Sequence, residues 1–300
     1  MPKQSNLMVT YALLVFIWST TPLAIVWSVE DLHPMWALAI RFFLALPLAL
    51  GLLWLFKTRL PFDRVSLHSY LAGACSFIGS QTFTYWSTDY LSSGIIALMF
   101  GLSPVISGLI GRFMFGMHLS LNQWLGMTIA LTGLSIICLG DADQHIQPVG
   151  IVIALFGVLV YCMSMYWVKK INAPIDPMAQ AAGSIGLSVI FSIGMLPFIW
   201  QYAPTAMPHA KSLFGLGYAV IMASLIAMFC YFKLVQKIKP TTLSLTNVLT
   251  PMLALMIGAL LNNEKLPLIA LVGVVILLSG LVVYFLKEIR ASIQARHKKQ

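Results

Sequence analysis

Polar and aromatic side chains recur at helical spacing inside stretches of this chain that are otherwise apolar. An amide such as Gln81 is unfavourable on a helix face that contacts lipid, because an amide in hydrocarbon needs a hydrogen-bond partner. These side chains are therefore expected either to line a cavity or to bond neighbouring helices. The candidate substrate-binding residues are Trp18, Gln81, Tyr85, Met99, Ser103, Tyr161, Met165, Tyr231, Asn247 and Thr250.

A cavity of Trp, Tyr, Met, amide and hydroxyl groups suits a small amphipathic or zwitterionic solute, such as an amino acid. Phosphorylated sugars and nucleotides would need several buried Arg or Lys. The apolar stretches offer only Arg41 and Lys233, so we expect those solutes less.

The two charged residues Arg41 and Lys233 are candidate contacts for an anion. Arg41 lies about two turns into an apolar stretch. A charged side chain at the centre of a membrane span costs roughly 2.5 to 3.5 kcal/mol of insertion free energy. Arg41 is expected to snorkel outward or to pair with Glu30 or Asp31, with contact to a substrate carboxylate as the alternative. Lys233 belongs either to a basic cluster at the end of its stretch or to an anion site.

Three of the prolines inside the apolar stretches are candidate hinges: Pro22, Pro104 and Pro251. Each removes one backbone hydrogen bond and bends its helix. Ser103 and Thr250 precede two of them and can satisfy the freed carbonyls. These prolines are either structural kinks or hinges that narrow a cavity alternately on its two sides.

Catalytic and metal-binding patterns are missing from the sequence. It has no His-Glu-x-x-His motif, no nucleophile with its base, and no Asp, Glu or His near the centre of an apolar stretch. We therefore expect neither an enzyme nor a metal or cofactor site, and weak or no obligatory coupling to protons. A membrane scaffold and a channel remain alternatives to a carrier.

The composition identifies an integral membrane protein. Of 300 residues, 59% are hydrophobic and only 9% are charged, whereas about a quarter are charged in soluble domains. The formal net charge of +9 fits membrane topology rather than binding to nucleic acid. At about 20 residues per span, the apolar runs predict ten transmembrane helices at 7–29, 35–56, 67–88, 94–115, 123–140, 149–168, 178–200, 212–234, 241–261 and 267–286.

The basic residues indicate the orientation of these spans. Fifteen of the 18 Lys and Arg fall on the side of the N-terminus, two on the opposite side and one, Arg41, within a span. Cytoplasmic loops carry the excess of Lys and Arg. Both termini are therefore predicted to be cytoplasmic.

The sequence repeats itself after 147 residues. Residues 102–134 and 249–281 align without a gap, and 11 of the 33 positions are identical, four of them Pro or Gly. Five spans per half is an odd number, so the second copy enters the membrane in the opposite sense. Residues 1–140 and 149–300 are thus predicted to form two inverted repeats of one membrane domain, complete enough to work as a monomer.

These repeated segments resemble the EamA-type family of the drug/metabolite transporter superfamily. The resemblance rests on "SSGIIALMFGLSPVISGLIG", on "TTLSLTNVLTPMLALMIGALLNNE", and on the early "FIWSTTPLAIVWS" and "ALAIRFFLALPLAL". It implies ten helices in two inverted five-helix repeats, a central cavity walled by helices 1, 3, 4, 6, 8 and 9, and an export role in a bacterial inner membrane. Members carry amino acids, other metabolites and drugs, and relatives in the superfamily carry sugar phosphates or nucleotide sugars.

The chain departs from the family pattern at one place. The family commonly has Gly-Glu after the fourth and ninth helices, and here these positions are Gly116-Met117 and Asn263-Glu264. Only Glu264 is acidic, so a paired role of two acids is not expected.

Overall fold

A computed structural model describes residues 2–116, 118–139, 147–237, 246–262, 264 and 267–286, and this part of the chain is helical, without a strand. Its helices are α1 (Pro2–Ser28), α2 (Pro34–Leu55), α3 (Arg64–Ala74), the π-helix η1 (Cys75–Ser80), α4 (Gln81–Ser87), α5 (Ser93–Gly101), α6 (Ser103–Phe115), α7 (Leu121–Leu139), α8 (Pro148–Ile171), α9 (Pro177–Ile199), the 3-10 turn η2 (Trp200–Tyr202), α10 (Ala210–Tyr218), the π-helix η3 (Ala219–Ile226), α11 (Ala227–Lys237), α13 (Thr246–Leu261) and α14 (Leu268–Tyr284).

Many of these helices have the length and composition of membrane spans. Six runs are long and apolar enough to cross a bilayer: Leu7–Ser28, Pro34–Leu55, Ser93–Met114, Pro148–Ile171, Pro177–Tyr202 and Ala210–Leu234. Three shorter apolar helices occupy Leu121–Ile137, Leu249–Leu261 and Leu268–Tyr284. The molecule is therefore a multi-pass membrane protein.

Local sequence signals fix several helix ends. The Asp63 carboxylate accepts hydrogen bonds from two backbone N–H groups at the start of α3, at 3.1 Å each, and Asp176 accepts one at 2.8 Å at the start of α9. Side-chain oxygens at this position satisfy donors that the helix cannot pair. Gly116 ends α6 at a φ of 64°, a left-handed conformation that glycine adopts without strain.

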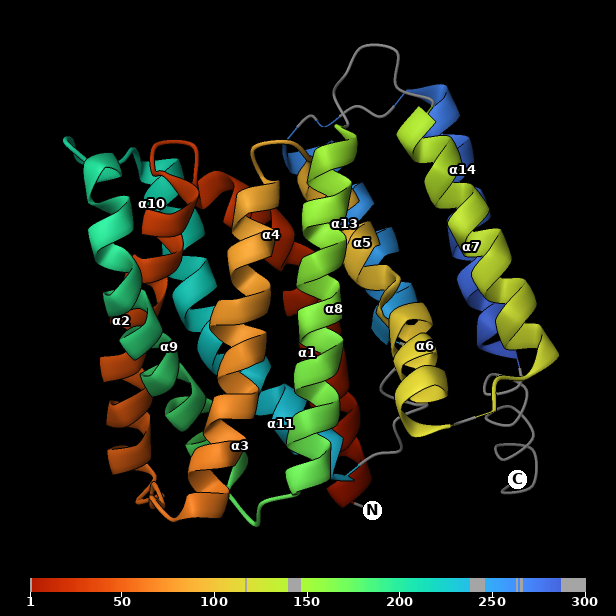
Figure 1. Ribbon diagram of the computed structural model, residues 1–300. Helices are drawn as coiled ribbons and strands as arrows, with labels where there is room; N and C mark the ends of the chain where they lie inside the picture. The colour runs from red at the N-terminus through yellow and green to blue at the C-terminus, as the bar shows by residue number, and fades with distance from the viewer. Residues whose placement is uncertain are drawn as a thin grey trace.

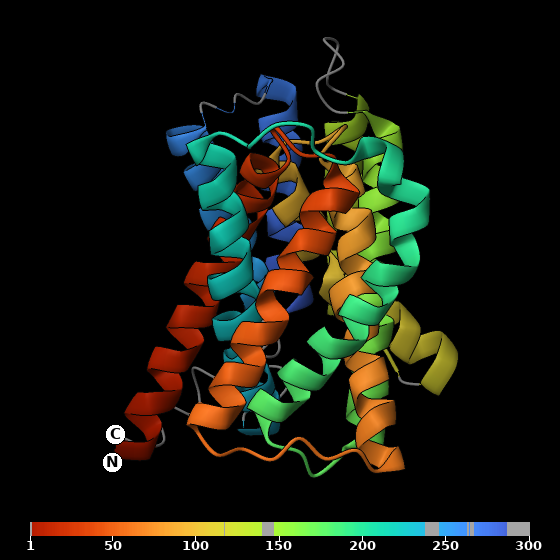
Figure 2. The same cartoon turned by 90° about the vertical axis from the view of Figure 1, so that its left-hand side faces the viewer.

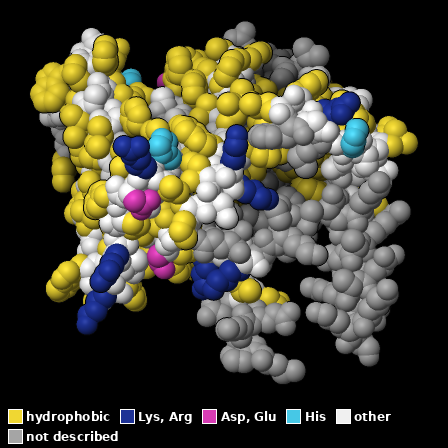
Figure 3. Space-filling view, turned by 60° about the horizontal axis from the view of Figure 1, so that its bottom comes forward, with side chains coloured by type: hydrophobic (Ala, Val, Ile, Leu, Met, Phe, Trp, Pro, Cys, Tyr) yellow, Lys and Arg dark blue, Asp and Glu magenta, His cyan; other side chains and the backbone are white. Residues whose placement is uncertain are grey.

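The connections between helices lie at two opposite ends of the molecule. Figures 1 and 2 place the start of α1 and the α2–α3 and α8–α9 connections at one end, and the α1–α2, α4–α5 and α9–α10 connections at the other. Figure 3 looks toward the first end, where Lys and Arg side chains gather. The connections at this end carry Lys57 and Arg59, and Lys169 and Lys170 lie in the last turn of α8. We call it the basic end.

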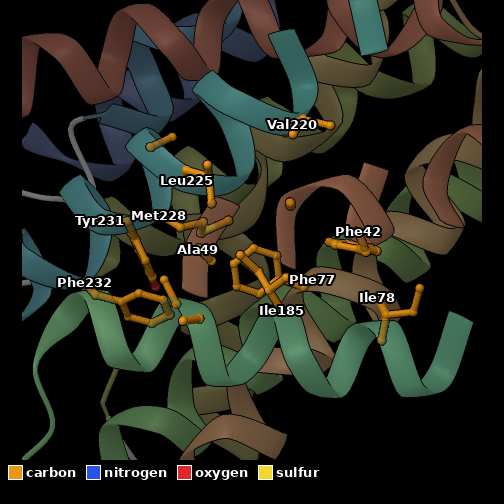
Figure 4. Close-up of a cluster of buried hydrophobic side chains, with 14 of the residues drawn as sticks. Phe42, Ala49, Phe77, Ile78, Ile185, Val220, Leu225, Met228, Tyr231 and Phe232 are labelled. Carbon is orange, nitrogen blue, oxygen red and sulfur yellow. The ribbon is translucent and has the colours of Figure 1, made fainter. Parts of the chain in front are cut away.

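Two clusters of buried apolar side chains form the core. The first joins α1 to α4 with α9, η3 and α11, and Figure 4 shows Phe42, Phe77, Ile185 and Met228 pointing toward one another within it. The second joins α5 to α8 with α14. Each cluster contains elements from both halves of the sequence, so neither half has a core of its own.

Helices α7 and α14 pack against each other along their length at one side of the molecule (Figure 1). A Cβ added to Gly133 would lie 2.4 Å from the Leu277 backbone nitrogen, and one added to Gly126 would lie 2.6 Å from the Gly280 carbonyl oxygen. Gly133 also meets the Gly273 carbonyl. As the position on α7 rises the partner position on α14 falls, so the two helices are antiparallel. Glycine is required here because only a missing side chain lets two backbones approach so closely.

Three irregular segments interrupt the helices of the interior. The π-helices η1 and η3 stand between α3 and α4 and between α10 and α11, at corresponding places in the two halves. Such segments are frequent at functional sites. The α-helix also breaks at Leu102, between α5 and α6, directly before Ser103 and Pro104. Pro251 lies inside α13 without a comparable break.

Candidate functional site

A cavity of about 100 Å³ lies between the two core clusters. Elements of both halves form its wall, and the irregular segments η1, η3 and the α5–α6 break all contribute residues to it. The lining residues are Trp18, Thr21, Pro22, Ile25, Arg41, Ser76, Gln81, Thr84, Ile96, Ala97, Phe100, Ser103, Tyr161, Ala223, Met228 and Thr250.

Arg41 is the one charged residue among them, and it is only 2% exposed. Its Nε donates to the Ser224 hydroxyl at 2.8 Å, and its Nη1 donates to the Gln81 amide oxygen at 3.0 Å and to the Tyr85 hydroxyl at 3.4 Å. Its Cζ also lies 5.9 Å from the centre of the Tyr85 ring. Neutral groups on two other elements, α4 and η3, therefore fix the guanidinium plane.

The expectation that Arg41 snorkels outward or pairs with Glu30 or Asp31 is wrong. Glu30 accepts a hydrogen bond from Lys211 at 2.6 Å, and Asp31 accepts hydrogen bonds from Ser212 and from the His209 backbone N–H. The sequence predicts how far along its helix Arg41 lies, but it does not predict which side chains of other helices contact it. Here Gln81, Tyr85 and Ser224 close over it from the interior.

Hydroxyl groups add a second polar feature to the wall. The Ser103 hydroxyl is buried and has no hydrogen-bond partner among the described residues. The Thr21 hydroxyl donates to the Ile17 carbonyl at 2.6 Å, and the Thr84 hydroxyl donates to the Ser80 carbonyl at 3.0 Å. Thr21 and Thr84 therefore satisfy helix carbonyls, whereas the Ser103 hydroxyl satisfies no group among the described residues.

Aromatic rings from four helices adjoin this polar wall. Trp18 and Tyr231 have ring centres 5.5 Å apart, and Phe100 and Tyr161 have ring centres 5.9 Å apart. Tyr161 and Tyr231 adjoin each other, which links the two pairs. This aromatic group offers flat apolar surfaces on which the body of an amphipathic solute can stack.

The structure brings together many of the residues predicted from the sequence. Trp18, Gln81, Ser103, Tyr161 and Thr250 line the cavity, as do Pro22 and Arg41. Tyr85 and Tyr231 lie behind the wall, as partners of Arg41 and Trp18.

Other predicted residues lie elsewhere. Met99 is fully buried in the second core cluster and Met165 is partly buried on α8, and neither lines the cavity. Lys233 lies between α11 and α1, with its Nζ 3.5 Å from the Thr10 hydroxyl. The backbone of Asn247 belongs to α13, but its side chain lies outside the described residues.

The predicted hinges differ in their surroundings. Pro104 occupies the first turn of α6, where its missing N–H costs no helix bond, and its carbonyl accepts a hydrogen bond from Tyr284 at 3.0 Å. Pro251 is buried within α13. Their proposed function as hinges stays a prediction.

Sequence reasoning missed several lining residues, among them Thr21, Thr84, Phe100 and Met228. Helical spacing could have predicted two of them, because Thr21 and Thr84 each follow a predicted residue by three positions and so lie on the same helix face. Ser224, which holds Arg41, carried no such signal, because its position depends on the π-helix η3.

A second hollow, of about 580 Å³, lies between α6, α7 and α8. Its lining is wholly apolar, with Leu, Ile, Val, Met and Phe side chains. Such a wall has no group with which to orient a polar solute. Among the described residues no three His, Cys, Asp or Glu side chains gather as a metal site would require.

Comparisons with known proteins place the chain in a family. The model of the EamA-like transporter family matches residues 6–139 and again residues 148–286. The chain is 26% identical over 254 residues to the inner membrane transporter YedA of Escherichia coli (strain K12), which covers 84% of this chain and 82% of YedA. It is 25% identical over 258 residues to the protein PagO of Salmonella typhimurium, with 84% of each chain covered.

More distant likenesses cover nearly the whole chain. The transporter YdfC of Bacillus subtilis is 22% identical over 290 residues, which is 95% of this chain and 92% of YdfC. One solved crystal structure matches with a TM-score of 0.66 over 99% of both chains at 13% sequence identity, a likeness of fold alone. Both halves of the chain match one family model, and the chain therefore belongs to the EamA-like transporter family of the drug/metabolite transporter superfamily.

Proposed function

We propose that this protein is a secondary transporter that exports small amphipathic or zwitterionic metabolites such as amino acids, by alternating access of two inverted repeats around the cavity. The main support for this proposal is that residues of the cavity wall occur in pairs at equivalent positions of the two repeats. Ser76 and Ala223, Gln81 and Met228, and Ser103 and Thr250 all line the cavity, and each pair is separated by the same 147 residues. A site on the pseudo-two-fold axis between two repeats is typical of secondary transporters.

The antiparallel contact of α7 with α14 supports the inverted arrangement and ten spans. Gly126 meets Gly280 while Gly133 meets Gly273, and these four glycines are themselves the repeated positions. An exchange of this kind is what a two-fold axis produces, because residue i contacts j while the equivalent of j contacts the equivalent of i. The axis then lies in the membrane plane.

The basic end supports cytoplasmic termini. The described chain begins at this end, and the α2–α3 connection with Lys57 and Arg59 and the last turn of α8 with Lys169 and Lys170 lie there too. Figure 3 shows Lys and Arg side chains gathered on this face. Short cytoplasmic loops are enriched in these residues. In this orientation the opposite end faces outward.

Contacts between the two halves at that end are the basis for a proposed outer gate. Glu264 accepts hydrogen bonds from the Ser93 hydroxyl at 2.6 Å and from the Gly94 N–H at 3.2 Å, so a residue of the second half caps the start of α5 in the first. Trp27 on α1 donates to the Asn262 side chain at 2.9 Å. Outward opening must break these contacts, which makes them the outer gate of the proposed cycle.

The size and charge of the cavity favour a small solute. At about 100 Å³ it is smaller than the pockets of about 300 to 1,000 Å³ that hold drug-sized ligands. Arg41 is its one charged lining residue, whereas phosphate recognition generally uses several cations. These features argue against nucleotide sugars and sugar phosphates.

Counterflow in proteoliposomes tests the proposal. Vesicles loaded with one unlabelled amino acid at a time are diluted into the labelled form, and a carrier gives a transient, saturable accumulation of label. We expect counterflow of at least one amino acid, lost on Trp18→Ala and on Gln81→Ala, because both side chains line the cavity.

Matched controls separate the cavity from general damage. Trp54, 83% exposed on α2, and Gln147, exposed before α8, lie away from the cavity. Trp54→Ala and Gln147→Ala are therefore expected to keep counterflow. Flux that never saturates would indicate a channel, and unchanged counterflow in both cavity variants would refute the proposed site.

A further inference from the structure

Arg41 is a buried cation without an acidic partner among the described residues. No residue that lines the cavity is acidic. The acidic side chains that the structure describes lie elsewhere. Glu30 and Asp31 bond partners on α10 or just before it, Asp63 and Asp176 cap helices, Glu264 caps α5, and Asp89 is exposed in the turn after α4. Burial of an uncompensated charge is costly, so such a group indicates a function that uses the charge.

The guanidinium is held with one edge open. Its Nε and Nη1 donate to Ser224, Gln81 and Tyr85, whereas its Nη2 makes no hydrogen bond to a described residue. Arg41 is nevertheless part of the cavity wall. The protein thus orients the cation with neutral groups and leaves donors for something that enters the cavity.

We propose that the transported substrate is a monocarboxylate, amino acids included, whose carboxylate binds Arg41 Nη2 and serves as its counter-ion. This inference rests on the transport function proposed above and adds the charge of the substrate. Trp18, Phe100 and Tyr161 receive the apolar body of the solute, and the unpartnered Ser103 hydroxyl is available for its second polar group.

The balance of charge defines the class further. One carboxylate neutralises one Arg41, so the loaded cavity carries no net charge from these two groups. A second carboxylate or a phosphate would leave a negative charge without a partner. A cation without a carboxylate would leave Arg41 uncompensated and add a second positive charge, whereas the ammonium of an amino acid enters together with the carboxylate that pairs with Arg41 and can donate to the Ser103 hydroxyl. Dicarboxylates, phosphate esters and amines without a carboxylate are therefore excluded.

The test compares acids with their isosteric amides on the purified full-length protein. Isothermal titration calorimetry measures binding of 3-phenylpropionate, 4-methylpentanoate and butanoate, and of the primary amide of each. We expect at least one acid to bind about tenfold or more tightly than its amide, as expected when a charge-assisted hydrogen bond replaces a neutral one. The inference is wrong if no acid binds more tightly than its amide.

Substitutions assign the preference to Arg41. Arg41→Gln is expected to bind acid and amide equally, and Arg41→Lys to keep part of the preference, since lysine supplies the charge without the fixed fork. Arg112→Gln is the matched control, because Arg112 is exposed near the end of α6 and does not line the cavity. It should retain the full preference. If Arg41→Gln does not fold, the acid and amide comparison on the unaltered protein still decides.

Binding and transport can fail separately. Counterflow of uncharged solutes together with equal binding of acids and amides would refute the monocarboxylate site but not the proposed carrier function. Binding that depends on Arg41 without counterflow of any solute would support the site and refute the carrier.

Discussion

The α7–α14 pair and the cavity are two regions built from the same repeat, and they differ in what the repeat has kept. In the α7–α14 pair, glycine faces glycine in both directions, and the contact is backbone against backbone. Around the cavity the repeated positions remain in place but their chemistry differs, as with Gln81 opposite Met228. Close packing between backbones tolerates no added atom, whereas a cavity wall can change side chains without losing the fold.

Arg41 makes the same contrast sharper. Its partners come from α4 and η3, so elements of both halves converge on one cation in the first half. The helices therefore pair across the two halves, whereas the charged group of the proposed binding site belongs to the first half alone. We infer that duplication supplied the moving frame and that divergence within the wall supplied selectivity.

Filling the glycine contact should have the largest effect. Gly133→Leu would place a Cβ 2.4 Å from the Leu277 nitrogen and force α7 away from α14. We expect a cost of about 3 kcal/mol or more and little folded protein, measured by fluorescence-detected size exclusion. Gly51→Leu is the control, because a Cβ at Gly51 meets nothing within 4 Å. Normal folding of Gly133→Leu would show that the contact is dispensable.

The α5–α6 break should respond more strongly to substitution than the continuous helix α13. Pro104→Ala restores an N–H at the break and allows α5 and α6 to join, whereas Pro251→Ala changes a helix that is already continuous. We therefore expect a larger loss of counterflow rate for Pro104→Ala, with thermal stability retained in both. Equal rates in the two variants would argue against a hinge at Pro104.

Weakening the outer gate should have a smaller effect. Glu264→Gln removes the charge that caps α5, at a cost of about 1 kcal/mol, and should favour the outward-open state. The measurement is labelling of an introduced cavity cysteine from outside, which should become faster. Asp176→Asn removes the charge of a helix cap at the basic end instead, and the same labelling should not accelerate.

The smallest effect is expected in the loop between α1 and α2. Hydrogen bonds from Ser212 and His209 lower the pKa of Asp31 from 3.8 to about 2. A carboxyl group whose pKa is lowered by folding stabilises the folded state at pH values above its ordinary pKa. This contribution to stability is lost as the pH falls toward 2. The difference in unfolding temperature between the unaltered protein and Asp31→Asn should therefore be small at pH 6 and shrink toward pH 3. A constant difference would contradict it.

The sequence predicted the helical membrane fold well, because apolar runs and helix-ending residues are local signals. It also predicted part of the cavity, since Trp18, Gln81 and Ser103 are polar or aromatic interruptions of apolar faces. It misplaced Met99 and the surroundings of Arg41, because both depend on how distant helices pack. The π-helix that positions Ser224 has no simple periodic pattern, so that contact could not be anticipated.

The central claim is that one cavity opens alternately to the two sides of the membrane. Ser103→Cys, in a background lacking the native cysteines, places a thiol of nearly the same size in its wall. A membrane-impermeant maleimide should label it both in intact cells and in inverted vesicles, and a transported solute should slow both reactions. Ser188→Cys, buried on α9 outside the cavity, should stay unlabelled. Labelling of Ser103→Cys from one side only, or labelling that no transported solute slows, would contradict alternating access at this cavity.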